Sequence, residues 1–487
     1  MTRVAFGIAG AVVAVQRAVS ARYGYHRDEL YFVASGRRLA WGYVDQPPLS
    51  PAVARLAQTL FGDSLVGLRL FPALAGGGVV LLTALIAREL GGGPFAQTLA
   101  ALAAAVSGVF LGVHHLAGPT SYDQLAWAGA LFLVLRILGG GDPRLWLAVG
   151  AIVGVGLLNK HTVLFLVGGL AVGLLAVGPR DMLRSGWLWA GIAIALVIWL
   201  PNLLWQVRHD WATLEMTRSL REKNSGFGGV VELLVGQVLE ISPVLVPLWI
   251  VGLVALLRGP ELQTYRSVAV AYFVILAVLI VSGGKFYYLA PIYTALFAAG
   301  AVTVERVTRD GDFWLGRPTI VAGIVVLSLP TFFLALPVVP VDRVEPLRKI
   351  NWELGETVGW PTFVDTVAGV YDDLSPGERD GAVIFTRNYG EAGAVDRFGD
   401  EHGLPRASSG HNNYWWWGPP ESDGDVAIVI GVEAQQALTP FFETCELATR
   451  IDNGVDIDNE EQGAGVYVCR GRRAPWAEIW SDLRHYN

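Results

Sequence analysis

The chain has 487 residues, of which 53% are hydrophobic and 16% charged, whereas soluble domains carry roughly 25% charged residues. This composition argues against a water-soluble globule. Residues 1–340 have a net charge of +7 and residues 341–487 a net charge of −14, which indicates a basic membrane domain followed by an acidic aqueous domain. No basic stripe or recognition motif occurs, so nucleic-acid binding is not expected.

Apolar segments recur through the first 340 residues. A spanning helix needs about 20 mostly apolar residues, and eleven segments approach this length, near residues 4–20, 66–87, 95–113, 124–139, 145–158, 162–178, 186–204, 230–256, 267–282, 288–304 and 318–337. Arg17 interrupts the first segment. Because no small-residue cleavage site is evident, we expect an uncleaved helix there and not a signal peptide.

The short loops set the expected orientation. With the N-terminus in the cytoplasm, every turn on the inside is basic, as the positive-inside rule requires. The outer segments are then residues 21–65, 114–122, 159–161, 206–228, 283–287 and the tail from 341 to 487. The sequence thus predicts an α-helical polytopic membrane protein with about eleven transmembrane helices. Its membrane domain, residues 1–340, includes the first outer loop, and a small extracytoplasmic α/β domain follows.

The first outer loop begins with an acidic pair, Asp28 and Glu29. Four apolar residues follow, Leu30, Phe32, Val33 and Leu39. Their spacing predicts an amphipathic helix lying on the membrane surface. A carboxylate that loses bulk hydration near a membrane is a candidate general base, unless a cation such as Arg27 holds it ionised. The alternative, left open by the spacing alone, is that Asp28 only caps this helix.

Lysine is rare in this chain, with four lysines against 32 arginines, and three of the four fall in outer segments: Lys160, Lys223 and Lys285. A cation at a membrane boundary can simply extend its side chain to the headgroups. The positive-inside pattern, however, places cations on the other face. Three outer lysines therefore favour an anionic ligand such as a lipid phosphate.

Several motifs occur in a fixed order along the chain. They are Asp28-Glu29, Pro47-Pro48-Leu49, the segments 120–125, 154–162 and 284–291, and the tail segment 411–420. In this order they resemble the GT-C superfamily of glycosyltransferases, and more narrowly its protein O-mannosyltransferase-like branch, which includes the lipid A aminoarabinose transferases. The resemblance extends over most of the chain.

The resemblance implies an inverting transfer of a sugar from a polyprenyl-phosphate carrier to a glycan, lipid or protein acceptor, outside a bacterial inner (plasma) membrane. Asp28, with Glu29 beside it, matches the family's catalytic acidic pair. Lys160 and Lys285 match positions that contact the lipid phosphate, and Tyr288 adds a hydroxyl donor. Either Arg218 or Arg221, which share an outer loop, matches a further phosphate-binding arginine.

The remaining candidates concern the substrate and a metal. Asp45, Gln46 and Asp123 are expected substrate contacts, although Gln46 stands where the aminoarabinose transferases have a lysine, and helix capping is the favoured explanation for Asp123. No cofactor is expected to be required. A divalent metal is left open, with Asp45 and either His114 or His115 as ligands. Adjacent histidines on a helix point to different faces, so one ion is not expected to bind both.

The tail, residues 341–487, reads as a small α/β domain. Two apolar runs, at 382–385 and 425–432, predict strands, each followed by a helix, at 389–398 and 433–442. A further strand pair, at 446–451 and 465–469, would bring Cys445 and Cys469 together, as a disulfide outside the cell or as two unpaired thiols. No glycine-rich phosphate loop follows the early strands. The tryptophan run 415–417 would stack on a sugar or anchor the tail at the interface.

The main rival to an enzyme is a transporter or flippase of a lipid-linked substrate. Such a protein is expected to show related halves and helices broken near the midplane. No internal repeat is visible, and the polar residues fall in outer segments. A catalytically inactive scaffold is disfavoured, since Asp28 and the outer cations are all present.

Overall fold

The structure, a computed structural model, describes residues 2–224, 226–309, 316–432 and 435–486. The chain forms two compact units. The helical unit comprises Met1–Ser20, Gln46–Ser50 and Val66–Leu336, and the tail unit comprises Ala21–Asp45, Pro51–Leu65 and Pro337–Asn487. The tail begins close to the boundary expected at residue 340. The first outer loop, expected with the membrane helices, instead packs mainly with the tail.

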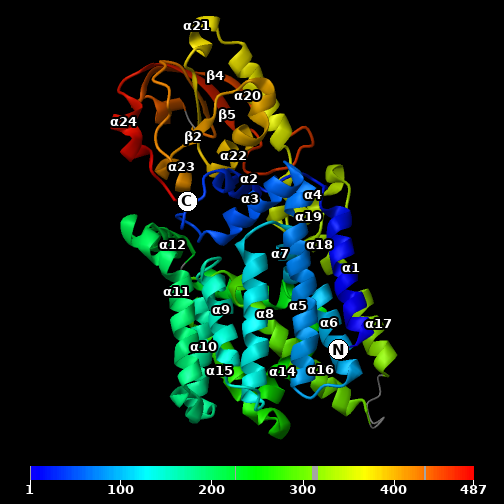
Figure 1. Cartoon of the computed structure of the whole chain (residues 1–487). Coiled ribbons are helices and arrows are strands. Elements are labelled where there is room, and N and C mark those ends of the chain that lie inside the picture. The colour runs from blue at the N-terminus through cyan, green and yellow to red at the C-terminus, as the bar shows by residue number, and fades with distance from the viewer. Residues whose placement is uncertain (1, 225, 310–315, 433–434, 487) are drawn as a thin grey trace. The chain divides into compact units, whose positions relative to one another are not determined.

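The helical unit is built almost wholly of α-helices (Figure 1). They are α1 (Arg3–Val19), α4 (Leu65–Leu68), α5 (Leu70–Glu89), α6 (Pro94–Val106), α7 (Gly108–His115), α8 (Pro119–Leu138), α9 (Leu145–Leu157), α10 (Val163–Val177), α11 (Gly186–Arg208), α12 (Ala212–Asn224), α13 (Phe227–Leu239), α14 (Val246–Arg258), α15 (Arg266–Ser282), α16 (Tyr293–Val307), α17 (Arg317–Leu327) and α18 (Leu329–Ala335). Each of the eleven predicted apolar segments lies mainly on these helices.

Fewer helices are long enough to cross a membrane alone. Among the described residues, five helices have the necessary length and apolar composition, and the number rises to seven if each of two bent pairs is one span. Two shorter apolar helices are α9 and α10. The multi-helical class is as predicted, and the figure of about eleven spans stays a prediction.

Two segments expected as single spans are broken. Helices α6 and α7 meet at 60°, and α13 meets the segment Pro243–Arg258 at 78°. Proline has no amide hydrogen and disfavours helix at the residue before it; that residue, Ser242, has φ 108°. The two breaks touch, because the amide of Val109 donates to the carbonyl of Glu240 at 2.7 Å.

Glycines bring several helices of this unit into close contact. A Cβ atom at Gly150 of α9 would lie 2.0 Å from the carbonyl oxygen of Gly191 of α11. One at Gly252 of α14 would lie 2.0 Å from the carbonyl oxygen of Leu296 of α16. Backbones approach this closely only where side chains are very small, as in other membrane-helix interfaces.

The tail unit is organised around a five-stranded sheet with strand order β2-β1-β3-β5-β4. Strand β1 pairs in parallel with β2 and β3, and β5 pairs antiparallel with β3 and β4. The strands are β1 (Val383–Thr386), β2 (Ala407–Ser409), β3 (Ala427–Ile430), β4 (Phe442–Arg450) and β5 (Gly465–Arg472). The helices are α2 (Arg27–Arg37), α3 (Leu49–Phe61, which starts in the helical unit), α19 (Glu345–Arg348), α20 (Trp360–Asp372), α21 (Pro376–Arg379), α22 (Tyr389–Phe398), α23 (Asn412–Trp416) and α24 (Trp476–Ile479).

Most of the expected tail elements are confirmed. The four predicted strands correspond to β1, β3, β4 and β5, and helix α22 has the predicted bounds. The helix predicted over 433–442 is wrong for its described part, where only a 3₁₀ turn, Gln435–Leu438, precedes β4. Cys445 and Cys469 lie opposite each other on β4 and β5 and form a disulfide. In the tryptophan run, the indole of Trp415 donates to the carbonyl of Trp480 at 2.8 Å within this unit.

Helix α2 is the amphipathic helix predicted after the first span, and its apolar face packs on protein; its location on a membrane surface stays a prediction. Its apolar residues Leu30, Phe32 and Val33 are buried in the tail unit. Helix α22 covers them, and Gly393 permits the approach, because a Cβ atom there would lie 2.9 Å from the backbone of Leu30. The partner helix lies more than 350 residues away along the chain, so local periodicity did not reveal it.

Candidate active site

Asp28 occupies the second position of α2. The cap of this helix is His26, whose Nδ1 accepts from the Asp28 amide at 3.1 Å, while Glu29 Oε2 accepts from the His26 amide at 2.8 Å. This reciprocal pair is a capping box, which satisfies amides that the helix itself leaves unpaired. Capping is therefore the work of His26 and Glu29, and the alternative that Asp28 is the cap is wrong.

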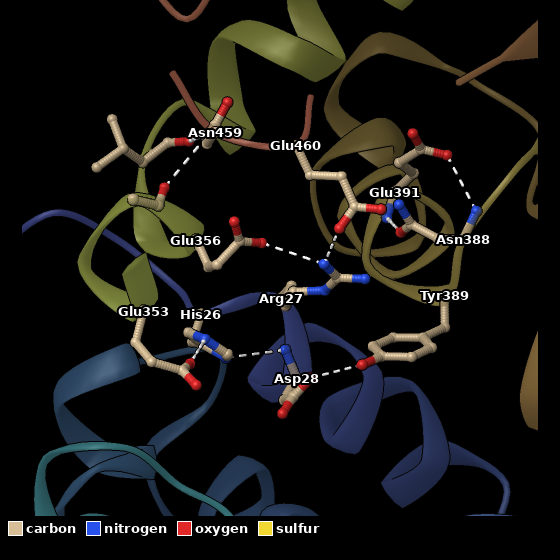
Figure 2. Close-up of polar contacts among 12 residues, drawn as sticks. His26, Arg27, Asp28, Glu353, Glu356, Asn388, Tyr389, Glu391, Asn459 and Glu460 are labelled. Atoms are coloured by element: carbon tan, nitrogen blue, oxygen red, sulfur yellow. Dashed lines mark hydrogen bonds and ion pairs between the residues drawn. The ribbon is translucent and has the colours of Figure 1, made fainter. Parts of the chain in front are cut away.

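The Asp28 carboxylate contacts a tyrosine from the far end of the chain. The hydroxyl of Tyr389, the first residue of α22, donates to Asp28 Oδ1 at 2.8 Å (Figure 2). The Tyr389 ring lies against that of Tyr31, with ring centres 4.8 Å apart, and the hydroxyl of Tyr31 donates to Asp45 Oδ1 at 2.8 Å. Two carboxylates are thus held by two packed tyrosines.

Burial and neighbouring charges shift the pKa values of Asp45 and Tyr389. Burial raises the pKa of Asp45 to about 7, with Asp28 as a further negative charge that raises it. Burial, and the charge of Asp28, raise the pKa of Tyr389 well above its usual range, so its hydroxyl remains a hydrogen donor at neutral pH. The guanidinium of Arg27 pairs with Glu356 at 3.2 Å and also with Glu460 (Figure 2). The positive charge beside Asp28 is therefore shared with acidic groups of the tail.

In the helical unit, the predicted lysines come together. The Lys160 ammonium bonds to the Thr120 hydroxyl at 2.9 Å and lies 5.1 and 4.7 Å from the ring centres of Tyr287 and Tyr288. The Lys285 ammonium lies 5.8 Å from the Tyr287 ring centre. These residues meet where α8 and α10 begin and where α9 and α15 end, so the loops that alternation assigned to one side do share one end of the helical unit.

The Pro-Pro-Leu motif packs on the same loop as Lys160. The Leu49 amide donates to the Leu158 carbonyl at 2.8 Å, and the Ser50 hydroxyl donates to Asn159 Oδ1 at 3.0 Å. Gln46, at the start of this segment, is 2% exposed. Neither polar atom of its side chain is hydrogen-bonded to any residue that the structure describes. A buried amide with unused donor and acceptor sites is suited to recognising a substrate hydroxyl.

The expected capping role of Asp123 is wrong. Helix α8 begins at Pro119, with Gly118 as its cap, because proline is favoured in a first helical turn. Asp123 therefore lies one turn inside the helix. Its carboxylate is buried and accepts hydrogen bonds from the Thr162 hydroxyl at 2.8 Å and the Trp127 indole at 3.1 Å. These contacts tie α8 to the loop that bears Lys160.

The remaining predicted residues lie elsewhere or make other contacts. Arg218 and Arg221 are exposed on α12, and the side chain of Lys223 falls outside the described part of the chain. The two rings of the histidine pair have different surroundings: His115 bonds to Gln16 and Arg69, and His114 packs on Gly76. Among the described residues, no group of three metal-ligand side chains includes Asp45, His114 or His115.

Sequence reasoning gave no role to four of the residues found here, Tyr31, Tyr389, Thr120 and Tyr287. Tyr389 lies 361 residues from Asp28 along the chain, and its position after a strand resembles any helix start. A position near Asp28 was predictable for Tyr31, because it lies about one helical turn after Asp28 in the same short helix. Thr120 and Tyr287 fall within the recognised motifs, although nothing local distinguishes them from their neighbours.

Comparisons with known proteins give a consistent result. Residues 45–205 match the family described as dolichyl-phosphate-mannose-protein mannosyltransferase. Lipid A galacturonosyltransferase RgtD from Rhizobium johnstonii is 29% identical over 202 residues, which are 40% of this chain and 41% of that protein. The chain thus matches less than half the length of this curated relative.

Solved structures match over a greater length. ArnT from Cupriavidus metallidurans, bound to undecaprenyl phosphate, is 16% identical with a TM-score of 0.58, covering 95% of this chain and 97% of that one. The chain has the GT-C glycosyltransferase fold. The mycobacterial arabinofuranosyltransferase AftD shares the GT-C fold, at 14% identity and a TM-score of 0.53 over 97% of this chain and 40% of that one. The family match includes Asp45, Gln46, Asp123 and Lys160, while Asp28 and Lys285 lie outside it.

Proposed function

We propose that this GT-C protein transfers a sugar from a polyprenyl-phosphate carrier to an acceptor nucleophile at the outer face of a bacterial plasma membrane. The observation that carries the proposal is the convergence of Lys160 and Lys285 on one tyrosine ring, at one end of a set of apolar helices. Support comes from the relatives, since the matching ArnT structure holds undecaprenyl phosphate and the curated relative RgtD is a lipid A galacturonosyltransferase.

The lysines would bind the phosphate of the donor. A lipid phosphate is the anion that reaches the boundary of a helical membrane bundle while its chain stays in the apolar region. Lys160 is held in place by Thr120 and two aromatic rings, so little side-chain entropy is lost when it binds the anion. The same positive charges would stabilise the phosphate as it leaves. This supply of charge leaves no need for a metal in the proposed transfer step.

Asp28 would act as the general base, with inversion at the sugar carbon. One oxygen of its carboxylate accepts from Tyr389, and the other would take the proton of the acceptor hydroxyl. The acceptor oxygen would then form a bond to the anomeric carbon as the bond from that carbon to the phosphate oxygen breaks. The polyprenyl phosphate would leave with the electron pair of the broken bond. Tyr389 would fix the orientation of the carboxylate, and Gln46 would bind a hydroxyl of the sugar.

Mass spectrometry of lipids co-purified with the protein, followed by a turnover assay with the donor so identified, tests this function. We expect the wild type to carry a polyprenyl phosphate or its sugar adduct. Asp28→Asn should retain the lipid and the thermal unfolding midpoint yet lose turnover, whereas Asp373→Asn, at an exposed carboxylate of the same unit, should remain active. Normal turnover by Asp28→Asn, or a wild type that carries no such lipid, would contradict the proposal.

One observation favours a second candidate, a transporter or flippase of a lipid-linked substrate. The two broken helix pairs touch at their breaks, and discontinuous helices are typical of transporter sites. Reconstitution distinguishes the two functions. A transporter moves the lipid-linked sugar across vesicles without cleaving it, whereas the proposed enzyme releases the polyprenyl phosphate and a glycosylated acceptor.

A further inference from the structure

Acidic side chains of the tail unit gather beside the start of α2. Carboxylate oxygens of Glu356, Glu460 and Glu461 all lie within 4.8 Å of one another. Arg27 is the cation paired with this cluster, and it bonds to Glu356 and Glu460 (Figure 2). Arg27 carries one charge against three carboxylates, and His26 and Arg348 add positive charge near Glu356. We call these three glutamates the acidic cluster.

Glu461 is the member of the acidic cluster that is buried without a hydrogen-bond donor among the described residues. Its side chain is 4% exposed, and neither carboxylate oxygen accepts a hydrogen bond from any described residue. A buried carboxylate with no donor is costly. A cation bound beside Glu461 would supply the partner that its carboxylate lacks among the described residues.

The backbone around the acidic cluster is fixed by bonds that do not involve the carboxylates. The side-chain amide of Asn459 donates to the carbonyls of Gly355 and Val358 at 3.2 and 3.1 Å (Figure 2). These bonds join the loop that carries Glu460 and Glu461 to the 3₁₀ turn Trp352–Thr357, which carries Glu356. A site whose supporting backbone is already fixed binds an ion with less loss of entropy.

We propose that the acidic cluster binds a calcium ion. Its ligands are oxygens only, and hard oxygen ligands are what calcium and magnesium prefer, whereas zinc favours histidine and cysteine. Calcium–oxygen distances are about 2.3–2.6 Å, so opposite ligands on one ion lie about 4.6–5.2 Å apart. The three carboxylate oxygens lie within 4.8 Å of one another, so one ion can reach all three, and calcium accepts the irregular geometry that three glutamates and a loop provide.

The site goes beyond the proposed transfer reaction and does not depend on it. A bound ion would hold the turn Trp352–Thr357 and the loop at 460–461 together next to Arg27. Because Arg27 precedes Asp28 in the first turn of α2, the ion would act on the stability of this helix end. The expected consequence is a more stable tail unit, whatever reaction the protein catalyses.

Calcium binding to the full-length protein in detergent, after removal of metals with a chelator, tests the site. We expect saturable binding in equilibrium dialysis with a dissociation constant on the order of 10⁻⁴–10⁻³ M, as in extracellular calcium modules. The thermal unfolding midpoint should rise over the same concentrations, relative to sodium chloride of equal ionic strength. Glu461→Gln should weaken binding at least about tenfold, while Asp456→Asn, in the same loop but exposed and outside the cluster, should not change it.

The alternatives give different results. If Glu461 holds only a proton, calcium leaves the thermal unfolding midpoint of the wild type unchanged, and that result overturns the proposal. Equal weakening by Glu461→Gln and Asp456→Asn shows unspecific surface binding and also overturns it. Magnesium binding tighter than calcium binding overturns the choice of ion. Should Glu461→Gln fail to fold, Glu460→Gln serves instead, because that side chain is 39% exposed, and unchanged affinity in it refutes the site.

Discussion

The two lysines near Tyr287 differ in burial, and this difference predicts unequal contributions to donor binding. Lys160 is half-buried and bonded to Thr120, whereas Lys285 is exposed. The perturbation is the replacement of each lysine by methionine, which keeps most of the side-chain length and removes the charge. Both variants should fold, because neither lysine belongs to the apolar core.

The expected magnitudes follow from the local dielectric. Two unit charges 4 Å apart attract by about 4 kcal/mol at an effective dielectric constant of about 20, and by about 1 kcal/mol in bulk water. Removing one partner of a buried charge pair costs about 2–5 kcal/mol, and an exposed pair is worth about 0.2–1 kcal/mol. Lys160→Met should therefore weaken binding of a lipid phosphate at least about 30-fold. Lys285→Met should weaken it no more than about fivefold.

Isothermal titration with farnesyl phosphate in detergent measures these affinities. Lys349→Met is the matched control, since Lys349 is an exposed lysine of the tail unit, and its affinity should equal that of the wild type. If Lys285→Met weakens binding as much as Lys160→Met, the reasoning from burial is wrong. If neither variant changes the affinity, the lysines do not bind the phosphate at all.

The other predictions concern stability. Burial raises the pKa of Asp45 to about 7, so between about pH 4 and pH 7 the folded protein holds a proton that the unfolded chain has released, and stability falls as the pH rises through this range. Asp45→Asn should therefore raise the thermal unfolding midpoint at pH 8 and leave it unchanged at pH 4. An equal shift at both pH values would contradict this. Gly252→Ala would place a Cβ atom 2.0 Å from a facing carbonyl and should destabilise by about 1–3 kcal/mol, whereas Gly168→Ala, which meets nothing within 4 Å, should be neutral in the same thermal assay. Replacing Cys445 and Cys469 together by serine should lower stability by about 3 kcal/mol, because their disulfide closes a loop over a separation of 24 residues; an unchanged urea midpoint would show that the disulfide does not form in solution.

The helices of the membrane domain and most elements of the tail were predictable from the sequence, because they depend on local composition. The apolar segments predicted the helices, since a membrane helix needs a long apolar stretch whatever its neighbours. The strands of the tail and helix α22 followed from short-range patterns. The convergence of Lys160 and Lys285 was also predictable from sequence, because alternation of spans assigns successive loops to opposite sides.

Other features were not predicted, in two cases because of nearby prolines and in one because the contact joins distant parts of the chain. The breaks at Ser107 and Ser242 lie within segments that are apolar on average, and mean hydropathy does not respond to a bend. The start of α8 four residues before Asp123 was set by Pro119 and not by the acidic residue. Burial of α2 by α22 likewise required a partner from the other end of the chain.

The sequence by itself determined the helical membrane class, the acidic tail and the residue types that phosphate and proton chemistry need, since each is a matter of composition and local order. Only the tertiary structure decided which groups meet. It paired Asp28 with Tyr389, placed Glu461 in a buried position without a hydrogen-bond donor among the described residues, and moved the first outer loop into the tail unit. The physical reason is that burial and charge pairing depend on packing between segments hundreds of residues apart, which no local pattern in the chain encodes.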